Sequence, residues 1–106
     1  MFPLDFQALP FQPARVFVVE SVPPGTLRGE HAHKHQQQAL ICLKGTVSVA
    51  MQVEGRTATV ELGSPKVALL MESGVWSAQR FVEPDSVLLV LASGEYDPQE
   101  YLDARS

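Results

Sequence analysis

Three histidines stand at alternate positions in the stretch RGEHAHKHQQQ, residues 28–38. Side chains of an extended chain alternate between two faces, so His31, His33 and His35 share one face if residues 31–35 are extended. Imidazoles that face a common cavity can bind a metal ion, transfer protons near neutral pH or hydrogen-bond a polar ligand. The segment therefore predicts a chemical site with histidine as its reactive group, and these three uses stay open.

The elements expected to position these histidines are short strands. Residues 46–53 alternate apolar and polar side chains, Glu54-Gly55 is a turn signal, and residues 56–62 alternate again, which predicts a β-hairpin. Further strands are expected from apolar and β-branched runs at 15–21, 38–43, 67–71, 75–81 and 86–92. Short strands separated by Gly- and Pro-containing turns predict an all-β sandwich or barrel.

The two ends of the chain differ from this pattern. Residues 1–13 hold three prolines and three phenylalanines, which oppose a helix. We expect residues 1–14 to form an extended arm that packs on its own domain or on a partner subunit. At the other end, Asp97 can cap a helix, Pro98 suits its first turn, and Glu100 follows the cap by three residues. These residues predict one short C-terminal helix over 97–105.

Composition places limits on the class of protein. A chain of 106 residues with 45% hydrophobic and 19% charged residues suits a single globular domain, 1–106. The net charge of −4 argues against a nucleic-acid-binding surface, and no apolar run is long enough to span a membrane. The one cysteine, Cys42, lies in an apolar run and is expected in the core. Without a signal peptide or an internal disulfide, the chain is expected to be cytoplasmic.

The spacing around the histidines is similar to a known motif. Gly25 is followed by five residues and then by His31-Ala32-His33; four more residues precede Gln38, and a further six precede Gly45. This resembles the first motif of the cupin superfamily, and the resemblance implies a jelly-roll β-barrel or sandwich with a site in the barrel mouth. In metal-binding cupins a glutamate occupies the position of Gln38, and a second motif supplies a histidine at the position of Ser77.

This comparison disfavours a metal ion. Two imidazoles with a neutral amide and a hydroxyl make a poor divalent-metal site, because zinc sites usually have at least three nitrogen, sulfur or carboxylate ligands. We therefore expect no metal and no other cofactor. If a metal is bound, His31 and His33 are its ligands, and His35 is the remaining candidate.

The resemblance is closest to one group of cupins. RGEHAHK (28–34), followed by a glutamine and ICLKG (41–45), resembles the sugar 3,4-ketoisomerases, WxcM-like cupins that act on dTDP-4-keto-6-deoxyglucose. Arg15-Val16, Trp76, VLLVLAS (87–93) and YDPQEYL (96–102) fit the same family, so the similarity covers nearly the whole chain.

The family implies an isomerase that moves a ketone from C4 to C3 of the sugar by proton transfer without a metal. The resemblance assigns catalysis to His33, as the main base, and to His31, as its partner. It also implies substrate-binding roles for four residues, of which Arg28 would hold the diphosphate and Gln38 would hydrogen-bond the sugar: Arg28, Gln38, Trp76 and Arg15. The expected partners are a dTDP-hexose and a second copy of the chain. The homodimer is expected because the apolar arm and strands apolar on both faces would otherwise expose hydrophobic surface.

Two features depart from the family pattern. A tyrosine is usual in the first strand, where this chain has Phe17, Val18 and Val19, and a histidine commonly follows the tryptophan, where this chain has Ser77. Two alternatives therefore stand beside the isomerase. One is a non-catalytic sugar- or nucleotide-binding cupin, and the other is a metal cupin with a reduced ligand set.

Overall fold

The structure, a computed structural model, describes residues 9–102 apart from the side chains of His31, Tyr101 and Leu102. The described residues form nine strands and one 3₁₀ turn. In chain order these are β1 (Arg15–Val19), β2 (Leu27–His33), β3 (Gln38–Lys44), β4 (Val47–Val53), β5 (Arg56–Leu62), β6 (Leu69–Met71), β7 (Trp76–Phe81), β8 (Val87–Ala92), η2 (Pro98–Glu100) and β9 (Tyr101–Leu102).

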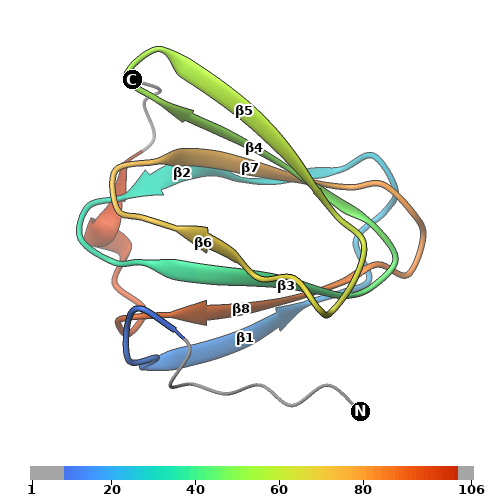
Figure 1. Ribbon diagram of the computed structural model, residues 1–106, viewed down its shortest axis with the longest axis horizontal. Coiled ribbons are helices and arrows are strands. Elements are labelled where there is room, and N and C mark those ends of the chain that lie inside the picture. The colour runs from blue at the N-terminus through green and yellow to red at the C-terminus, as the bar shows by residue number, and fades with distance from the viewer. Residues whose placement is uncertain (1–8, 103–106) are drawn as a thin grey trace.

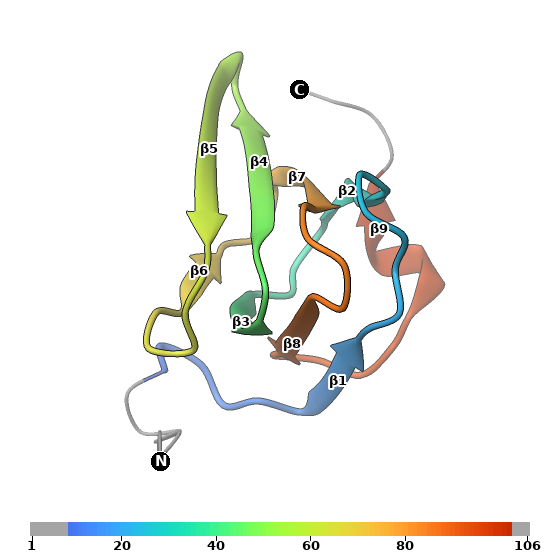
Figure 2. The same ribbon diagram turned by 90° about the vertical axis from the view of Figure 1, so that its right-hand side faces the viewer.

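The strands form two sheets that face each other (Figure 1). One sheet has the order β1-β8-β3-β6 and the other has the order β5-β4-β7-β2-β9. Figure 2, which looks along the strands, shows the two sheets enclosing a common interior. The paired strands are antiparallel, for example β1 with β8 and β3 with β8. This architecture confirms the expected all-β sandwich or barrel.

All the strands except β2 and β9 form where the hydrophobic pattern predicts them. In β4, Val47 and Val49 are fully buried, whereas Ser48 and Ala50, which alternate with them, are only partly buried. The predicted turn at Glu54-Gly55 is present, and both residues have positive φ, 50° and 77°, as a two-residue hairpin turn of the primed type requires.

The main core lies between the two sheets and includes buried side chains from β3, β4, β7 and β8. Cys42 belongs to this core, as expected, and its thiol donates to the carbonyl of Lys44 at 3.2 Å. Burial raises the pKa of the Cys42 thiol, and backbone hydrogen bonds only partly offset this. Cys42 is therefore a packed neutral thiol rather than a nucleophile.

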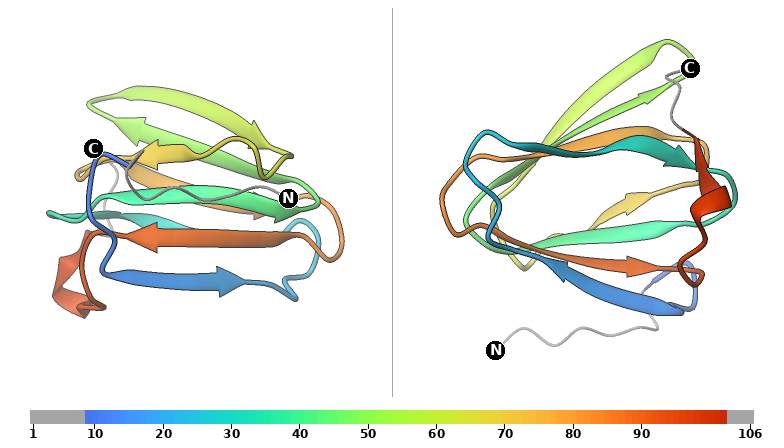
Figure 3. Two further views of the ribbon diagram at one scale, coloured as in Figure 1. Left: turned by 60° about the horizontal axis from the view of Figure 1, so that its bottom comes forward. Right: turned by 180° about the vertical axis from the view of Figure 1, so that it is seen from behind.

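The structure corrects two local expectations and leaves part of a third outside the described residues. The C-terminal helix is a single 3₁₀ turn, because Tyr101 and Leu102 leave it to pair with β2 as β9 (Figure 3, red). Strand β2 ends at His33, so His35 lies in a bend rather than on an extended 31–35 segment. Of the predicted arm, residues 1–8 lie outside the described residues. In the part of the chain that the structure describes, no helix has the length and apolar character needed to cross a membrane.

Candidate functional site

An irregularity in β2 determines which of its side chains reach the interior. Gly29 pairs with Ala78 of β7 and His31 pairs with Ser77, so Glu30 is an extra residue, a β-bulge. Both bulge residues have positive φ, 87° at Gly29 and 56° at Glu30. Arg28 and His33 are an odd number of residues apart and would lie on opposite faces of a regular strand. The extra residue brings both of them to the same cavity.

This cavity has a volume of about 200 Å³ and lies between the two sheets. Its lining comes from β1, β2, β3, β7 and β8, and one part of the wall is apolar: Phe17, Val19, Leu40, Phe81, Leu88 and Val90. The other part is polar: Arg28, His33, Gln38, Ser77 and Gln79, with Gly29 between them. An apolar pocket with a few convergent polar groups is the usual form of a small-molecule site.

His33 and Gln38 stand at the two ends of the connection between β2 and β3. His33 is the last residue of β2 and is only 6% exposed, and its carbonyl accepts the N–H of Gly74 at 2.7 Å. Gln38 is the first residue of β3, and it is buried opposite Ala92 of β8. The structure thus brings an imidazole and a neutral amide to one cavity. The backbone of His31 lies two residues before His33, but its side chain is outside the described set.

Gln79 is a cavity residue that sequence reasoning missed. Its Nε2 donates to Ser77 Oγ at 3.3 Å, and a Cβ added to Gly29 would stand 2.7 Å from its Oε1. The side chain of Gln79 therefore packs directly over the bulge glycine. The signal was present in the sequence, because Ser77 and Gln79 are two residues apart in one strand and must share a face.

The remaining predicted substrate residues are placed differently. Arg28 is exposed and lines the cavity. The guanidinium of Arg15 lies 5.1 Å from the ring centroid of Phe17 and 5.8 Å from that of Tyr96, and its buried Nε has no hydrogen-bond partner. Arg15 pairs with Ala92, which also pairs with Gln38, so it stands beside the polar end of the cavity without lining it.

Trp76 lies elsewhere. It precedes Ser77 in β7 and so points to the opposite face of the sheet, where it forms a small buried cluster with Ala32 and Ala78. It does not belong to the cavity lining.

The bend after His33 is held by a carboxylate that sequence reasoning treated only as a helix-capping residue. Glu100 is buried and accepts the backbone N–H groups of His35 and Gln36. Burial raises the pKa of the Glu100 carboxyl, but these two N–H groups and the charges of His35 and His33 outweigh it, so the pKa lies below its ordinary value. Glu100 is therefore an ionised carboxylate at neutral pH.

The donor set of the cavity does not suit a divalent metal. Among the described side chains, no group of three or more His, Cys, Asp or Glu residues is placed to hold an ion. The polar wall offers an imidazole, two amides, a hydroxyl and a guanidinium, and none of these supplies a negative charge. The same set is suited to hydrogen-bonding a neutral sugar ring and to moving a proton.

The paired antiparallel sheets and the polar cavity between them define a small cupin-type barrel. A model of the family "FdtA: WxcM-like, C-terminal" matches residues 3–106. The chain belongs to this family.

Relatives with assigned activities are similar over most of the chain. The TDP-4-oxo-6-deoxy-alpha-D-glucose-3,4-oxoisomerase of Aneurinibacillus thermoaerophilus is 34% identical over 94 residues, which cover 89% of this chain and 68% of that protein. QdtA, a sugar 3,4-ketoisomerase from Thermoanaerobacterium thermosaccharolyticum crystallised with TDP, is 34% identical with a TM-score of 0.91, covering 96% of this chain and 75% of QdtA. A histidine-to-asparagine mutant of QdtA, crystallised with TDP-4-keto-6-deoxyglucose, is 33% identical with a TM-score of 0.91 and the same coverage.

Proposed function

We propose that this chain is a sugar-nucleotide 3,4-ketoisomerase that converts a dTDP-4-keto-6-deoxyhexose to its 3-keto isomer. The observation that carries the proposal is the cavity itself, in which His33 and Gln38 meet on a polar wall opposite an apolar one. The activity and the nucleotide in the names of the relatives support the reaction type and the substrate class.

The reaction needs one group that accepts and returns a proton. His33 removes the proton from C3, and the electron pair of that bond forms the C3–C4 double bond of an enediol while the C4 oxygen takes up a proton. A proton delivered to C4 and the loss of the O3 proton then leave the ketone on C3. Atoms and charge balance, so no oxidant or reductant is consumed. Histidine suits both directions because its pKa lies near neutral pH. His31 remains the proposed partner of His33 in this transfer.

The other residues bind the substrate in this proposal. Gln38 hydrogen-bonds the sugar without adding a charge, and Ser77 and Gln79 extend the same neutral wall. Arg28 and Arg15 hold the diphosphate, which is supported by the exposed position of Arg28 at the cavity and by the unsatisfied buried Nε of Arg15. Trp76 does not line the cavity, so its proposed contribution is limited to packing on the face of β7 opposite the cavity.

One observation favours a second candidate, a cupin that binds a sugar nucleotide without converting it. Phe17 lines the cavity from β1, where the family pattern predicts a phenol, and Ser77 lines it where the pattern predicts a histidine. Both substitutions remove a group that can donate or accept a proton. This candidate predicts saturable TDP binding with no chemistry at the sugar.

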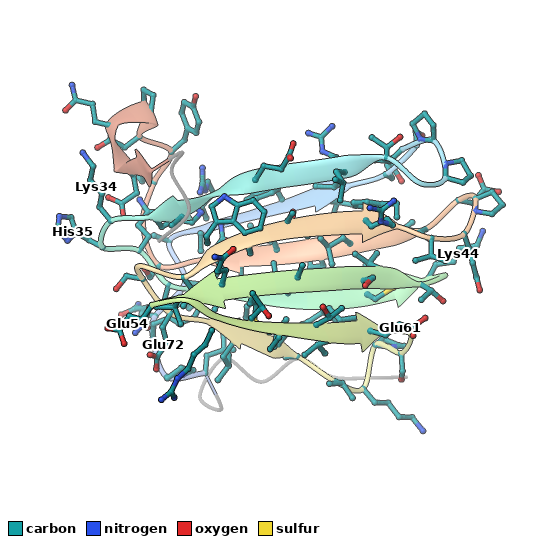
Figure 4. All side chains as sticks on the ribbon, turned by 90° about the horizontal axis from the view of Figure 1, so that it is seen from above. Lys34, His35, Lys44, Glu54, Glu61 and Glu72 are labelled. Carbon is teal, nitrogen blue, oxygen red and sulfur yellow. The ribbon has the colours of Figure 1, made fainter. Side chains whose placement is uncertain are left out.

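Solvent exchange separates the two candidates. The protein is incubated with dTDP-4-keto-6-deoxyglucose in D₂O, and deuterium at C3 and C4 is followed by NMR and mass spectrometry. We expect exchange in the natural protein and its loss in His33→Asn with the fold retained. His35→Asn is the matched control, because Figure 4 shows His35 at the end of β2 pointing away from the barrel, and we expect it to exchange normally. TDP binding without exchange in the natural protein would establish the non-catalytic candidate instead.

The proposal includes a homodimer in the cytoplasm with no nucleic-acid partner. Edge strand β1 presents Val16 and Val18, 59% and 49% exposed, on the face opposite the cavity, which a second copy would cover. Sedimentation velocity should give a dimer for the natural protein and a monomer for Val18→Lys, and a monomeric natural protein would overturn this part. The free buried thiol of Cys42 fits a reducing compartment, and the net charge of −4 disfavours nucleic acid.

A further inference from the structure

The connection between β2 and β3, residues 34–37, joins two residues of the proposed mechanism: the base that moves the proton and the amide that binds the sugar. His33 precedes it and Gln38 follows it. Because only four residues separate the two, we expect contacts that fix this connection to restrict the relative placement of the imidazole and the amide.

Three consecutive backbone N–H groups of this connection donate to one residue. The N–H of Lys34 donates to the carbonyl of Glu100 at 2.8 Å, and the N–H groups of His35 and Gln36 both donate to Oε1 of its carboxylate. Hydrogen bonds to an ionised carboxylate are about twice as strong as those between neutral groups. Glu100 therefore holds the connection more firmly than a loop–loop contact of neutral groups would.

The segment that carries Glu100 is itself anchored on both sides. The carbonyl of Asp97 accepts the N–H of Glu100 at 3.0 Å, which closes the η2 turn, and Tyr101 directly after it pairs with His33. The pairing of β2 with β7 runs to His31, and His33 beyond it stands opposite Tyr101 of β9 while its carbonyl accepts the N–H of Gly74. The segment that Glu100 anchors therefore lies directly beside the backbone of His33.

Neighbouring contacts complete the same attachment. The N–H of Gln37 donates to Ser93 Oγ at 2.8 Å, the N–H of Ser93 donates to the carbonyl of Gln37 at 2.9 Å, and Gln36 Nε2 donates to the carbonyl of Glu95 at 2.8 Å. All four N–H groups of the connection are therefore accepted by residues of the 93–100 segment. Among these acceptors, the carboxylate of Glu100 is the only charged group.

We propose that Glu100 is a positioning residue of the reaction, which fixes His33 and Gln38 in the cavity by binding the backbone N–H groups of the connection between them. The proposal rests on the proposed function. Glu100 does not line the cavity and takes no part in the proton transfer.

The test compares Glu100→Ala and Glu100→Gln with Glu95→Ala. Alanine removes the acceptor from two backbone N–H groups, whereas glutamine keeps an oxygen acceptor of the same reach without the charge. Glu95 is an exposed glutamate of the same segment and serves as the matched control. The readouts are kcat and KM for dTDP-4-keto-6-deoxyglucose, the affinity for TDP, and the melting temperature.

We expect Glu100→Ala to lower kcat about 10- to 100-fold, since a displacement of about 1 Å in a reacting group costs up to that much. KM should rise because Gln38, which binds the sugar, is displaced too, whereas TDP affinity should stay within about twofold because TDP has no sugar for Gln38 to bind. Glu100→Gln should recover part of kcat, and Glu95→Ala should match the natural protein. A folded Glu100→Ala protein with normal kcat would overturn the proposal. An equal loss of kcat and of TDP affinity would also overturn it, because that pattern indicates general damage.

A second readout separates this inference from the proposed function. NMR chemical shifts of the His33 ring and of the His35 and Gln36 amides report the arrangement without any turnover. We expect all three to shift in Glu100→Ala and none to shift in Glu95→Ala. If the natural protein shows no exchange of the sugar, the proposed function fails while these shifts still test the positioning. Unchanged His33 ring signals in Glu100→Ala would refute the positioning role of Glu100.

Discussion

Replacing Gly29 with alanine tests how the bulge shapes the cavity. Gly29 has a φ of +87°, a region that L side chains rarely adopt, and an added Cβ would stand 2.7 Å from Gln79 Oε1. Backbone strain and displacement of Gln79 therefore act together at this one position.

The two contributions can be estimated separately. Left-handed backbone costs a residue with a Cβ about 1–2 kcal/mol, part of which is offset by about 0.4–1 kcal/mol because alanine has less freedom than glycine in the unfolded chain. Gln79 is flexible and can rotate away, but its hydrogen bond to Ser77 is then lost, which costs about 0.5–1.5 kcal/mol. Gly29→Ala should thus lower the free energy of unfolding by about 0.5–3 kcal/mol.

Gly25→Ala is the control for strain alone. Gly25 has a φ of +84°, and an added Cβ there would meet nothing within 4 Å. Urea denaturation of both variants should show Gly29→Ala to be the less stable by about 0.5–1.5 kcal/mol, the value of the lost hydrogen bond. TDP affinity should fall in Gly29→Ala, because displacement of Gln79 changes the cavity wall, and should not change in Gly25→Ala.

The Gln79→Ala background completes the cycle. There the added Cβ meets no amide, so Gly29→Ala should cost no more than Gly25→Ala costs in the natural protein. In this view, glycine is required at position 29 because a Cβ there would collide with Gln79. The view would be refuted if both glycine variants lost the same free energy of unfolding, or if Gly29→Ala cost as much in the Gln79→Ala background as in the natural protein.

Three further predictions follow from buried polar groups. Ser86 Oγ accepts the N–H of Thr46 at 3.1 Å and donates to the carbonyl of Glu83 at 2.8 Å, so Ser86→Ala should lower the unfolding free energy by about 1–3 kcal/mol in urea titrations; an unchanged midpoint would contradict this. The folded pKa of Glu100 lies below its ordinary value of 4.5, so its stabilisation is complete above that pH and is lost as the pH falls through the lower folded value. The stability difference between the natural protein and Glu100→Gln should therefore shrink on acidification from pH 6 to pH 3, and a constant difference would argue against an ionised Glu100. The Cys42 thiol, whose pKa burial raises, should react with a thiol reagent only as fast as the protein unfolds, and rapid labelling in native buffer would contradict its burial.

The strands of the core could be predicted from the sequence because their periodicity is local. Residues 46–53 and 56–62 alternate strictly, and the hairpin between them has the turn residues that its geometry requires. Strand β2 is harder to recognise, because LRGEHAH has little hydrophobic alternation and contains a bulge. After the bulge, each side chain points to the face opposite the one that regular alternation from the first part of the strand would give. The bulge is visible only once the pairing with β7 is known.

The site was predictable where it follows a motif, and the rest depends on contacts between distant residues. The first-motif spacing led to His33 and Gln38, which share the cavity. Glu100 contacts backbone groups more than 60 residues away, at His35 and Gln36, and no local pattern reveals such a contact. The expected C-terminal helix stopped after one turn for the same reason, since pairing with β2 outweighs the weak preference of a short helix.

The pairing of β1 with β8 has a consequence for how the chain folds. Arg15 pairs with Ala92, so the cavity wall that β1 contributes closes only after most of the chain has been synthesised. Closing so long a loop is entropically costly, and barrels built from such pairings fold slowly. A ribosome-bound chain that ends before β8 has no complete pocket, and TDP binding would therefore report the finished barrel during refolding.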